Sequence, residues 1–159
     1  MILEPQKRIS KKGLTVWRIS GAIHSFLVFL VAGGAITLTF VFDWPKWIII
    51  VAFMTFALYA YLFIILIPTL RWKRWRYEVR ENEIELQHGV FVIKRTLVPM
   101  VRVQHVDTQQ GPILRKYQLA TITVSTAATV HEIPALEMDE AEELRFFISK
   151  LARVADEDV

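Results

Sequence analysis

Residues 19–42 read ISGAIHSFLVFLVAGGAITLTFVF, and residues 44–67 read WPKWIIIVAFMTFALYAYLFIILI. Each stretch has 24 residues, and about 20 apolar residues in a helix suffice to cross the hydrocarbon core of a bilayer. Asp43 and Lys46 are the two charged residues between positions 19 and 67. Helices that are apolar on every side do not match the amphipathic pattern of a surface helix in a soluble protein. The two stretches therefore predict two transmembrane helices.

The link between the two stretches, residues 43–46, is so short that the helices must be antiparallel neighbours. Pro45 suits the first turn of the second helix, and Asp43 is a plausible cap for it. Gly33 and Gly34 would allow the helices to approach closely. A cleaved signal peptide is the alternative interpretation of the N-terminal stretch, but the stretch is too long for one and a second span follows at once.

Basic residues flank the outer ends of the hairpin. They are Lys11, Lys12 and Arg18 before the first stretch, and Arg71, Lys73, Arg74 and Arg76 after the second. The link contains a single lysine. The positive-inside rule therefore predicts a cell-membrane protein whose basic N-terminus (residues 1–18) and C-terminus are cytoplasmic, with the link outside.

The strongest basic cluster follows the second stretch directly. It consists of Arg71, Trp72, Lys73, Arg74, Trp75 and Arg76. Such a cluster would attract anionic headgroups by about 1 kcal/mol per basic residue near the surface. A simple membrane-interface anchor explains the same residues without any lipid-sensing role. Both interpretations of this interface cluster remain open at this point.

Residues 71–155 are predicted to form one folded domain, because the hydrophobic pattern changes from continuous to alternating near residue 76. Turn signals at 81–82 and 88–89 separate two short alternating strands. Further strands are predicted at residues 90–98, 101–109, 119–126 and 130–133. Apolar residues at helical spacing from 141 to 154, with Asp139 and Glu142 in the form of a capping box, predict a terminal helix.

Several short motifs in this domain resemble those of a known family. They are Gly89-Val90-Phe91, residues 97–106 (LVPMVRVQHV), residues 110–115 (QGPILR), Leu119-Ala120-Thr121 and Ser125-Thr126-Ala127. In this order, and behind two spans, they are similar to the membrane-anchored bacterial pleckstrin-homology (PH) domain family of the YdbS type. Gln118 and Ala128 stand where the family often has glycine, which puts the local turn geometry in question but not the fold.

The resemblance covers roughly residues 15–150 and implies a fold class. This class is a two-helix transmembrane hairpin followed by an α+β, mainly-β PH-like domain, a bent antiparallel barrel of six to seven strands capped by a C-terminal helix. The resemblance also implies a non-enzymatic scaffold or protein-interaction module. Its expected partners are the lipid bilayer and another membrane protein, either a related protein with several PH domains or a second copy of this chain.

The alternative function is a lipid- or peptide-handling component of envelope stress resistance or export. It would require polar residues along one face of both spans. Those available are His24, Ser25, Thr37, Thr39, Thr55, Tyr59 and Tyr61. His24 is the one ionisable residue well inside a span, and we expect it to be neutral and hydrogen-bonded to a neighbour.

The residues that carry chemistry are few. The sequence has no cysteine, and its four histidines lack metal-ligand spacing, so we predict no catalytic residues, no metal site and no cofactor. His105 is expected to be a hydrogen-bonded strand residue on the face of Val101 and Val103. Arg102 and Gln104 would lie on the opposite face, so Arg102, Gln104 and His105 are candidates for a partner surface or ordinary solvated positions.

The chain is basic overall, with a net charge of +3, but the charge lies beside the apolar stretches and does not indicate nucleic-acid binding. Phosphoinositide binding is also disfavoured. Such a site needs lysine and arginine in the first hairpin loop, since charge-assisted bonds hold the phosphates. Here that loop, residues 80–83, reads RENE and is acidic.

Overall fold

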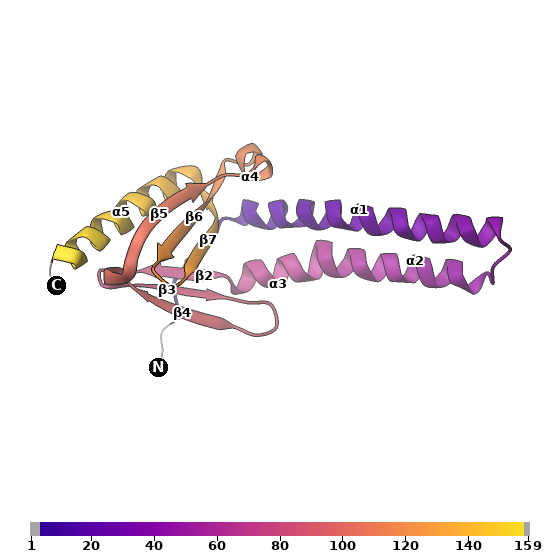
Figure 1. Cartoon of the computed structure of the whole chain (residues 1–159), viewed down its shortest axis with the longest axis horizontal. Helices are drawn as coiled ribbons and strands as arrows, with labels where there is room; N and C mark the ends of the chain where they lie inside the picture. Colours follow the sequence, from indigo (N-terminus) through magenta and orange to yellow (C-terminus); the bar gives the residue numbers. More distant parts are fainter. Residues whose placement is uncertain (1–3, 158–159) are drawn as a thin grey trace. The chain divides into compact units, whose positions relative to one another are not determined.

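The computed structural model of the chain describes residues 4–157 and divides into two compact units. The helical unit contains residues 14–70, and the strand unit contains residues 71 onward together with the N-terminal segment up to Gly13. The first three residues of the predicted N-terminal region 1–18 lie outside the described residues. Figure 1 shows the order of the elements along the chain.

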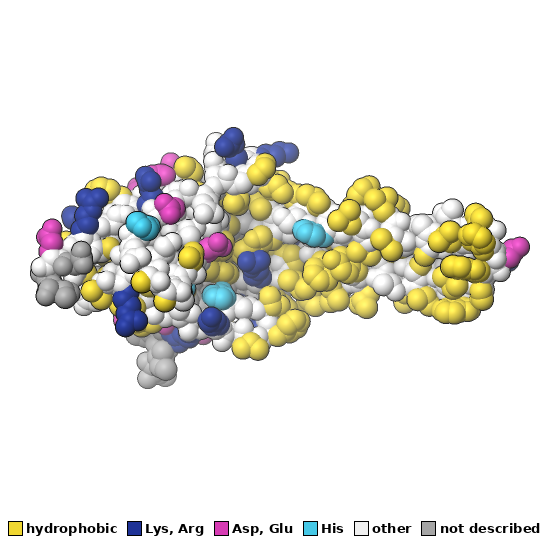
Figure 2. All heavy atoms as spheres, viewed as in Figure 1, with side chains coloured by type: hydrophobic (Ala, Val, Ile, Leu, Met, Phe, Trp, Pro, Cys, Tyr) yellow, Lys and Arg dark blue, Asp and Glu magenta, His cyan; other side chains and the backbone are white. Residues whose placement is uncertain are grey.

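The helices run through both predicted spans. Helix α1 covers Lys11–Val41, and α2 (Trp47–Ala60) continues through the π-helical segment η1 (Tyr61–Leu66) into α3 (Ile67–Arg74). Two helices, Lys11–Val41 and Trp47–Arg74, are long and apolar enough to cross a membrane, with mean hydropathies of 1.9 and 2.6. Hydrophobic side chains cover the surface of α1 and α2 in Figure 2. These apolar helices confirm the helical part of the predicted fold class.

The link between the helices differs in detail from the prediction. Asp43 has a positive φ of 49°, and the N-cap position of α2 is occupied by Lys46, without a hydrogen bond from its side chain. The amide of Trp44 donates to the carbonyl oxygen of Thr39 at 3.0 Å. Asp43 therefore belongs to the turn that ends α1, and its predicted role as a cap of α2 is wrong.

The strand unit contains two antiparallel sheets. The first has the order β1 (Lys7–Arg8), β2 (Arg76–Val79), β3 (Glu83–His88) and β4 (Lys94–Pro99). The second has the order β5 (Val103–Gln109), β6 (Leu119–Thr126) and β7 (Val130–Glu137). The 3₁₀ turn η2 (Met100–Arg102) joins the sheets, and α4 (Pro112–Lys116) joins β5 to β6. The terminal helix α5 covers Met138–Glu157.

The two sheets, seven strands in the described residues, and the C-terminal helix confirm the predicted fold class. Three strands differ from their predicted limits, and one of them, β7, continues beyond residue 133 to Glu137. Residues 90–93 form the loop before β4, because Gly89 turns the chain at a φ of 139°. Residues 100–102 form a 3₁₀ turn, so β5 begins at Val103 and not at Val101.

Strand β1 was not predicted at all. Lys7 pairs with Tyr77 and Arg8 with Arg76 in antiparallel register. Two basic residues have no alternating apolar pattern, so local sequence cannot indicate this strand. The basic N-terminal segment is therefore part of the folded strand unit.

The core of the strand unit lies between the two sheets and helix α5. Its largest fully buried side chains come from both sheets, η2 and α5: Tyr77, Ile84, Leu86, Met100, Leu119, Ile122, Val124, Ile133, Leu136 and Ile148. Helix α5 packs against η2, β5, β6 and β7. Its predicted stripe is buried at Ala141, Leu144 and Ile148, but Phe147 and Val154 are exposed. The helix begins at Met138, so Asp139 lies inside its first turn and does not cap it.

Candidate functional site

A hollow of about 1160 Å³ opens on the strand unit where the two sheets separate. The end of β4, the turn η2, strand β5, the turn between β6 and β7, and the last turns of α5 line it. β4 and β5 are each the outer strand of their sheet. The hollow therefore has an edge strand of each sheet on its wall.

Strand β5 pairs with β6 along one side, and within the described residues no other strand pairs with it. An edge strand presents backbone donors and acceptors that can pair with another chain. Figure 1 shows β5 and α5 adjacent in the strand unit, in agreement with their packing contact. A segment added to β5 in the hollow would therefore lie close to α5.

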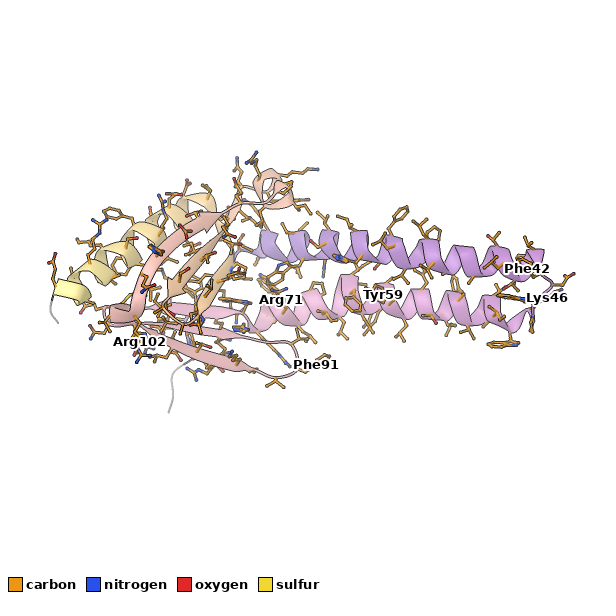
Figure 3. The ribbon with its side chains drawn as sticks, viewed as in Figure 1. Phe42, Lys46, Tyr59, Arg71, Phe91 and Arg102 are labelled. Atoms are coloured by element: carbon orange, nitrogen blue, oxygen red, sulfur yellow. The ribbon has the colours of Figure 1, made fainter. Side chains whose placement is uncertain are left out.

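The three residues predicted as a partner surface all line this hollow. Arg102, Gln104 and His105 are each exposed, and Figure 3 labels Arg102 beside the lower end of β5. The register of β5 against β6 shifts between Val103 and His105, so Gln104 is a bulge. Bulges re-aim side chains at sheet edges. The predicted alternation that placed His105 on the face of Val101 and Val103 is therefore wrong, although the three candidates do share one site.

The rest of the lining combines apolar and charged groups. Leu97 and Val101 are exposed by 53% and 50% although both are apolar. Arg102 and Arg153 are the two arginines of the lining, and Asp107 supplies its one carboxylate. This composition suits a polypeptide with apolar and acidic side chains better than a small polar substrate.

Two histidines line the hollow, His105 and His131. The ring nitrogen Nε2 of His131 lies 2.9 Å from the hydroxyl of Thr129. Among the residues the structure describes, no three His, Asp or Glu side chains are grouped so that they could hold a metal ion. The pair offers hydrogen bonds to a ligand but no metal centre.

The interface cluster, residues 71–76, does not form one uniform basic surface. Trp75 is buried at 4% exposure and stacks on His88, with ring centroids 5.9 Å apart. Arg74 donates to the carbonyl oxygen of Val90. Trp72 donates through Nε1 to the carbonyl oxygen of Ser10 at 3.1 Å. These three side chains are therefore engaged inside the strand unit.

The remaining members of the interface cluster are cationic. Arg76 forms an ion pair with Glu4 at 2.5 Å. Arg71 and Lys73 are exposed, and Figure 3 labels Arg71. The exposed cations of the interface cluster are thus Arg71 and Lys73, whereas Trp75 packs inside the strand unit.

The single arginine of the first hairpin loop, Arg80, is hydrogen-bonded to three carboxylates. Arg80 makes hydrogen bonds of 2.9 to 3.2 Å with Glu78, Glu83 and Glu85. These partners raise the pKa of Arg80, with the hydrogen bond to Glu78 as the largest cause. A phosphate group would have to compete with three carboxylates for this guanidinium, which argues against a phosphoinositide site in the loop.

Polar side chains in the helical unit bond to their own helix. Ser25, Thr37 and Thr39 donate to the carbonyl four residues earlier at 2.8 to 2.9 Å. His24 does the same through Nδ1, which lies 2.7 Å from the carbonyl oxygen of Ser20. Because a carbonyl can only accept, Nδ1 carries the proton. The hydrogen bond expected for His24 is present, and these groups are satisfied without a transported solute.

The model of the family described as "Bacterial PH domain" matches residues 24–152 of this chain, which is most of its length. The chain belongs to the bacterial PH domain family. The matched region includes most of the first predicted span and all of the second.

Two curated relatives come from Bacillus subtilis (strain 168). The chain is 53% identical over 156 residues to "UPF0699 transmembrane protein YdbS", and the match covers 98% of both proteins. It is 22% identical over 94 residues to "UPF0699 transmembrane protein YdbT", covering 57% of this chain and 19% of that longer protein. No solved structure matches the chain significantly. With the two apolar helices, these matches identify the chain as a membrane protein.

Sequence reasoning missed the apolar part of the site. Leu97 and Val101 were assigned to strands, where an apolar residue is ordinarily buried, yet both are half exposed in the hollow. The signal that could have found them is Pro99. A proline inside a strand pattern indicates an edge strand, and an edge strand has one open side.

Proposed function

We propose that this bacterial PH domain protein is a non-enzymatic interaction module tethered to the cell membrane. Residues 19–42 and 44–67 would form the two spans, with residues 43–46 outside and the domain, residues 71–155, in the cytoplasm. The positive-inside bias of the flanking residues supports this orientation. The tether would keep the domain and its hollow at the membrane.

The observation that carries this proposal is the unpaired edge of β5 inside a hollow that α5 also lines. In β-augmentation, a partner segment pairs with an open strand edge. Backbone hydrogen bonds give affinity, and pockets for alternate side chains give specificity. β5 has seven residues, long enough to pair with a partner strand of about six residues, the usual strand length.

The lining of the hollow indicates the character of the partner segment. Exposed Leu97 and Val101 would contact apolar side chains, and Arg102 with Arg153 would contact an acidic one. An extended segment that alternates apolar with acidic or polar residues meets both requirements. Burial of the two apolar side chains would contribute about 25 cal/mol for each Å² removed from water.

We infer that the segment belongs to another membrane protein of this family. A partner anchored in the same bilayer meets the hollow at a raised effective concentration, so modest contacts suffice. The longer relative named YdbT shares a region of 94 residues with this chain and extends well beyond it. The part outside the shared region could supply such a segment.

The same geometry gives little support to other functions. The carboxylates around Arg80 weigh against phosphate recognition. Four of the seven polar residues of the spans, His24, Ser25, Thr37 and Thr39, bond within their own helix, which does not favour a role of the spans in handling lipid or peptide. In the described part of the chain the Thr129 hydroxyl lies 2.9 Å from Nε2 of His131, but no carboxylate is hydrogen-bonded to that ring to orient it as acyl-transfer chemistry requires.

The test is co-expression of the full chain with a tagged relative of the YdbT type, followed by cross-linking and purification in mild detergent. Arg102→Glu should reduce recovery of the complex about tenfold, the effect of roughly 1.4 kcal/mol at an interface. Lys150→Glu is the matched control, because Lys150 is exposed on α5 outside the lining of the hollow. It should leave recovery unchanged.

Val101→Asp is a second variant within the hollow, and thermal unfolding of each variant checks that it is folded. Recovery of this chain alone, under conditions that preserve other membrane complexes, would refute the partner. A complex that survives Arg102→Glu and Val101→Asp as well as Lys150→Glu would refute the β5 site.

A further inference from the structure

The loop between β3 and β4 is apolar throughout and exposed. It consists of Gly89, Val90, Phe91, Val92 and Ile93. Phe91 and Val92 are exposed by 80% and 81%, and Ile93 by 51%. Figure 3 shows the ring of Phe91 projecting from the tip of this hairpin. Loops at hairpin tips are normally polar, so this composition requires an explanation.

The loop has a defined conformation. Gly89 has a φ of 139°, and a Cβ at this position would overlap the carbonyl oxygen of Val92. The chain therefore turns tightly at Gly89 and directs the following apolar side chains outward. Arg74 donates to the carbonyl oxygen of Val90 and fastens the start of the loop.

Strand register places this loop at one end of the first sheet. β2 begins at Arg76, two residues after α3 ends, and Arg76 pairs with Gln87 near the end of β3. β1 runs antiparallel to β2, with Arg8 opposite Arg76, and α1 begins three residues later at Lys11. Both helices of the membrane hairpin therefore leave the first sheet at the end that carries the β3–β4 loop.

Two contacts connect the base of the loop to the residues that follow α3. His88 stacks on Trp75, and Arg74 binds the Val90 carbonyl. Burial lowers the pKa of His88, and the charge of Lys94 lowers it further. Arg74 lies seven residues after Ile67, a distance of about 10 Å along a helix. The loop is thus fastened to a segment that chain connectivity keeps near the bilayer surface.

The loop between β2 and β3, at the other end of the first sheet, has the opposite character. It contains Glu81 and Asn82, both exposed, and no large apolar residue. An apolar loop occurs at the end of the sheet where the chain continues into α1 and from α3, and a charged loop occurs at the opposite end. Lys94, exposed directly after the apolar loop, adds a cation where anionic headgroups would lie.

We propose that the β3–β4 loop inserts Phe91, Val92 and Ile93 into the leaflet from which the domain emerges. The ligand is the lipid of the protein's own membrane, at the boundary between headgroups and acyl chains. Lys94 pairs with headgroup phosphates beside the inserted loop. The loop's insertion does not depend on the proposed partner, so the two proposals can fail separately.

The absence of cysteine allows a direct test. Phe91→Cys and Ile93→Cys in the full chain are each labelled with the fluorophore NBD and reconstituted into nanodiscs of phosphatidylcholine with phosphatidylglycerol. Glu81→Cys is the matched control at the other end of the sheet. Emission from positions 91 and 93 should shift to the blue and be quenched by lipids with doxyl groups on their acyl chains. Emission from position 81 should be quenched by iodide in the water instead.

Iodide quenching at positions 91 and 93 equal to that at position 81, with no effect of doxyl lipid, would overturn the proposal. That result would show that the loop is exposed to water, where a protein partner could bind it. Because Phe91→Cys removes the Phe91 ring, the Ile93→Cys variant tests insertion with that ring still present. Circular dichroism of the labelled proteins checks that the hairpin is folded. Protection of position 91 from iodide without quenching by doxyl lipid would also overturn it, because the loop would then be covered by protein.

Discussion

Gly21 of α1 lies directly against the backbone of Phe63 in the π-helical segment η1. A Cβ at position 21 would overlap the Phe63 carbonyl oxygen. Gly33 and Gly34, which the sequence analysis selected for close helix approach, have no neighbouring atom within 4 Å of an added Cβ. Of these three glycines, Gly21 is therefore the one at which the second helix approaches closely, beside its π-helical turns.

Replacing Gly21 with alanine should destabilise the helical unit by about 1–3 kcal/mol, since the methyl group must displace backbone. Gly33→Ala is the matched control, and it should be neutral or stabilising by up to about 1 kcal/mol because alanine favours a helix. Thermal unfolding of both variants in the same detergent measures the difference. Equal midpoints for the two variants would contradict the close approach.

Gln118 occupies a position that favours glycine. Its φ is 55°, and its carbonyl accepts a hydrogen bond from Met138 at 3.0 Å. Gln118→Gly keeps this bond and relieves left-handed strain, so we expect a gain of about 1 kcal/mol in the free energy of unfolding. Ala128→Gly, at a residue without positive φ, should be neutral or destabilising. A loss of stability in Gln118→Gly would show that its side chain matters more than its backbone.

Tyr77 is fully buried in β2, and its hydroxyl donates to Glu140 of α5 at 2.6 Å. Burial is the largest cause that raises the Tyr77 pKa, so the phenol stays protonated as a donor. Tyr77→Phe should cost about 1.5–3 kcal/mol, the range for hydrogen bonds to charged groups. Tyr117→Phe removes a hydroxyl that has no hydrogen bond in the described part of the chain, and it should change the unfolding midpoint little.

Glu137 joins β7 to the N-terminal segment. Ser10 donates to it at 2.8 Å and Lys12 at 3.0 Å. The hydrogen bond from Ser10, and then that from Lys12, lower the pKa of Glu137 below 4.5. A depressed carboxyl pKa stabilises the folded state above the unfolded value, and this stabilisation is lost as the pH falls through the folded value.

The carboxyl resonance of Glu137 should therefore titrate below pH 4.5, and Ser10→Ala should move the midpoint upward towards 4.5. Glu137→Gln should speed amide exchange in β1 at neutral pH, because the segment then loses its charged contact. An unchanged midpoint in Ser10→Ala would contradict the hydrogen bond as the main cause.

The sequence predicted the elements that have strong local patterns. The two apolar stretches became helices, residues 119–126 became β6 with the predicted limits, and the spacing after residue 141 became part of α5. Each signal lies within one element, so neighbours in the fold need not be known. The limits failed at residues 90–93, where an apolar run is a loop because Gly89 turns the chain.

The candidate site was predicted only in part. Arg102, Gln104 and His105 do line one hollow, but their directions depend on the bulge at Gln104, which exists only in the pairing of β5 with β6. The exposure of Leu97 and Val101 depends on where the two sheets separate. Strand β1 depends on pairing with β2. None of these relationships is visible in local periodicity.

The amino-acid sequence by itself determined the membrane helices and the succession of strands and terminal helix, because hydrophobic period and turn residues act over a few positions. Only the tertiary structure decided which strands have open edges, that Gly21 and not Gly33 meets the second helix, and that the apolar loop lies at the end of the sheet where both membrane helices leave. Pairing of distant residues sets these features, and the free energy of each pairing depends on both partners.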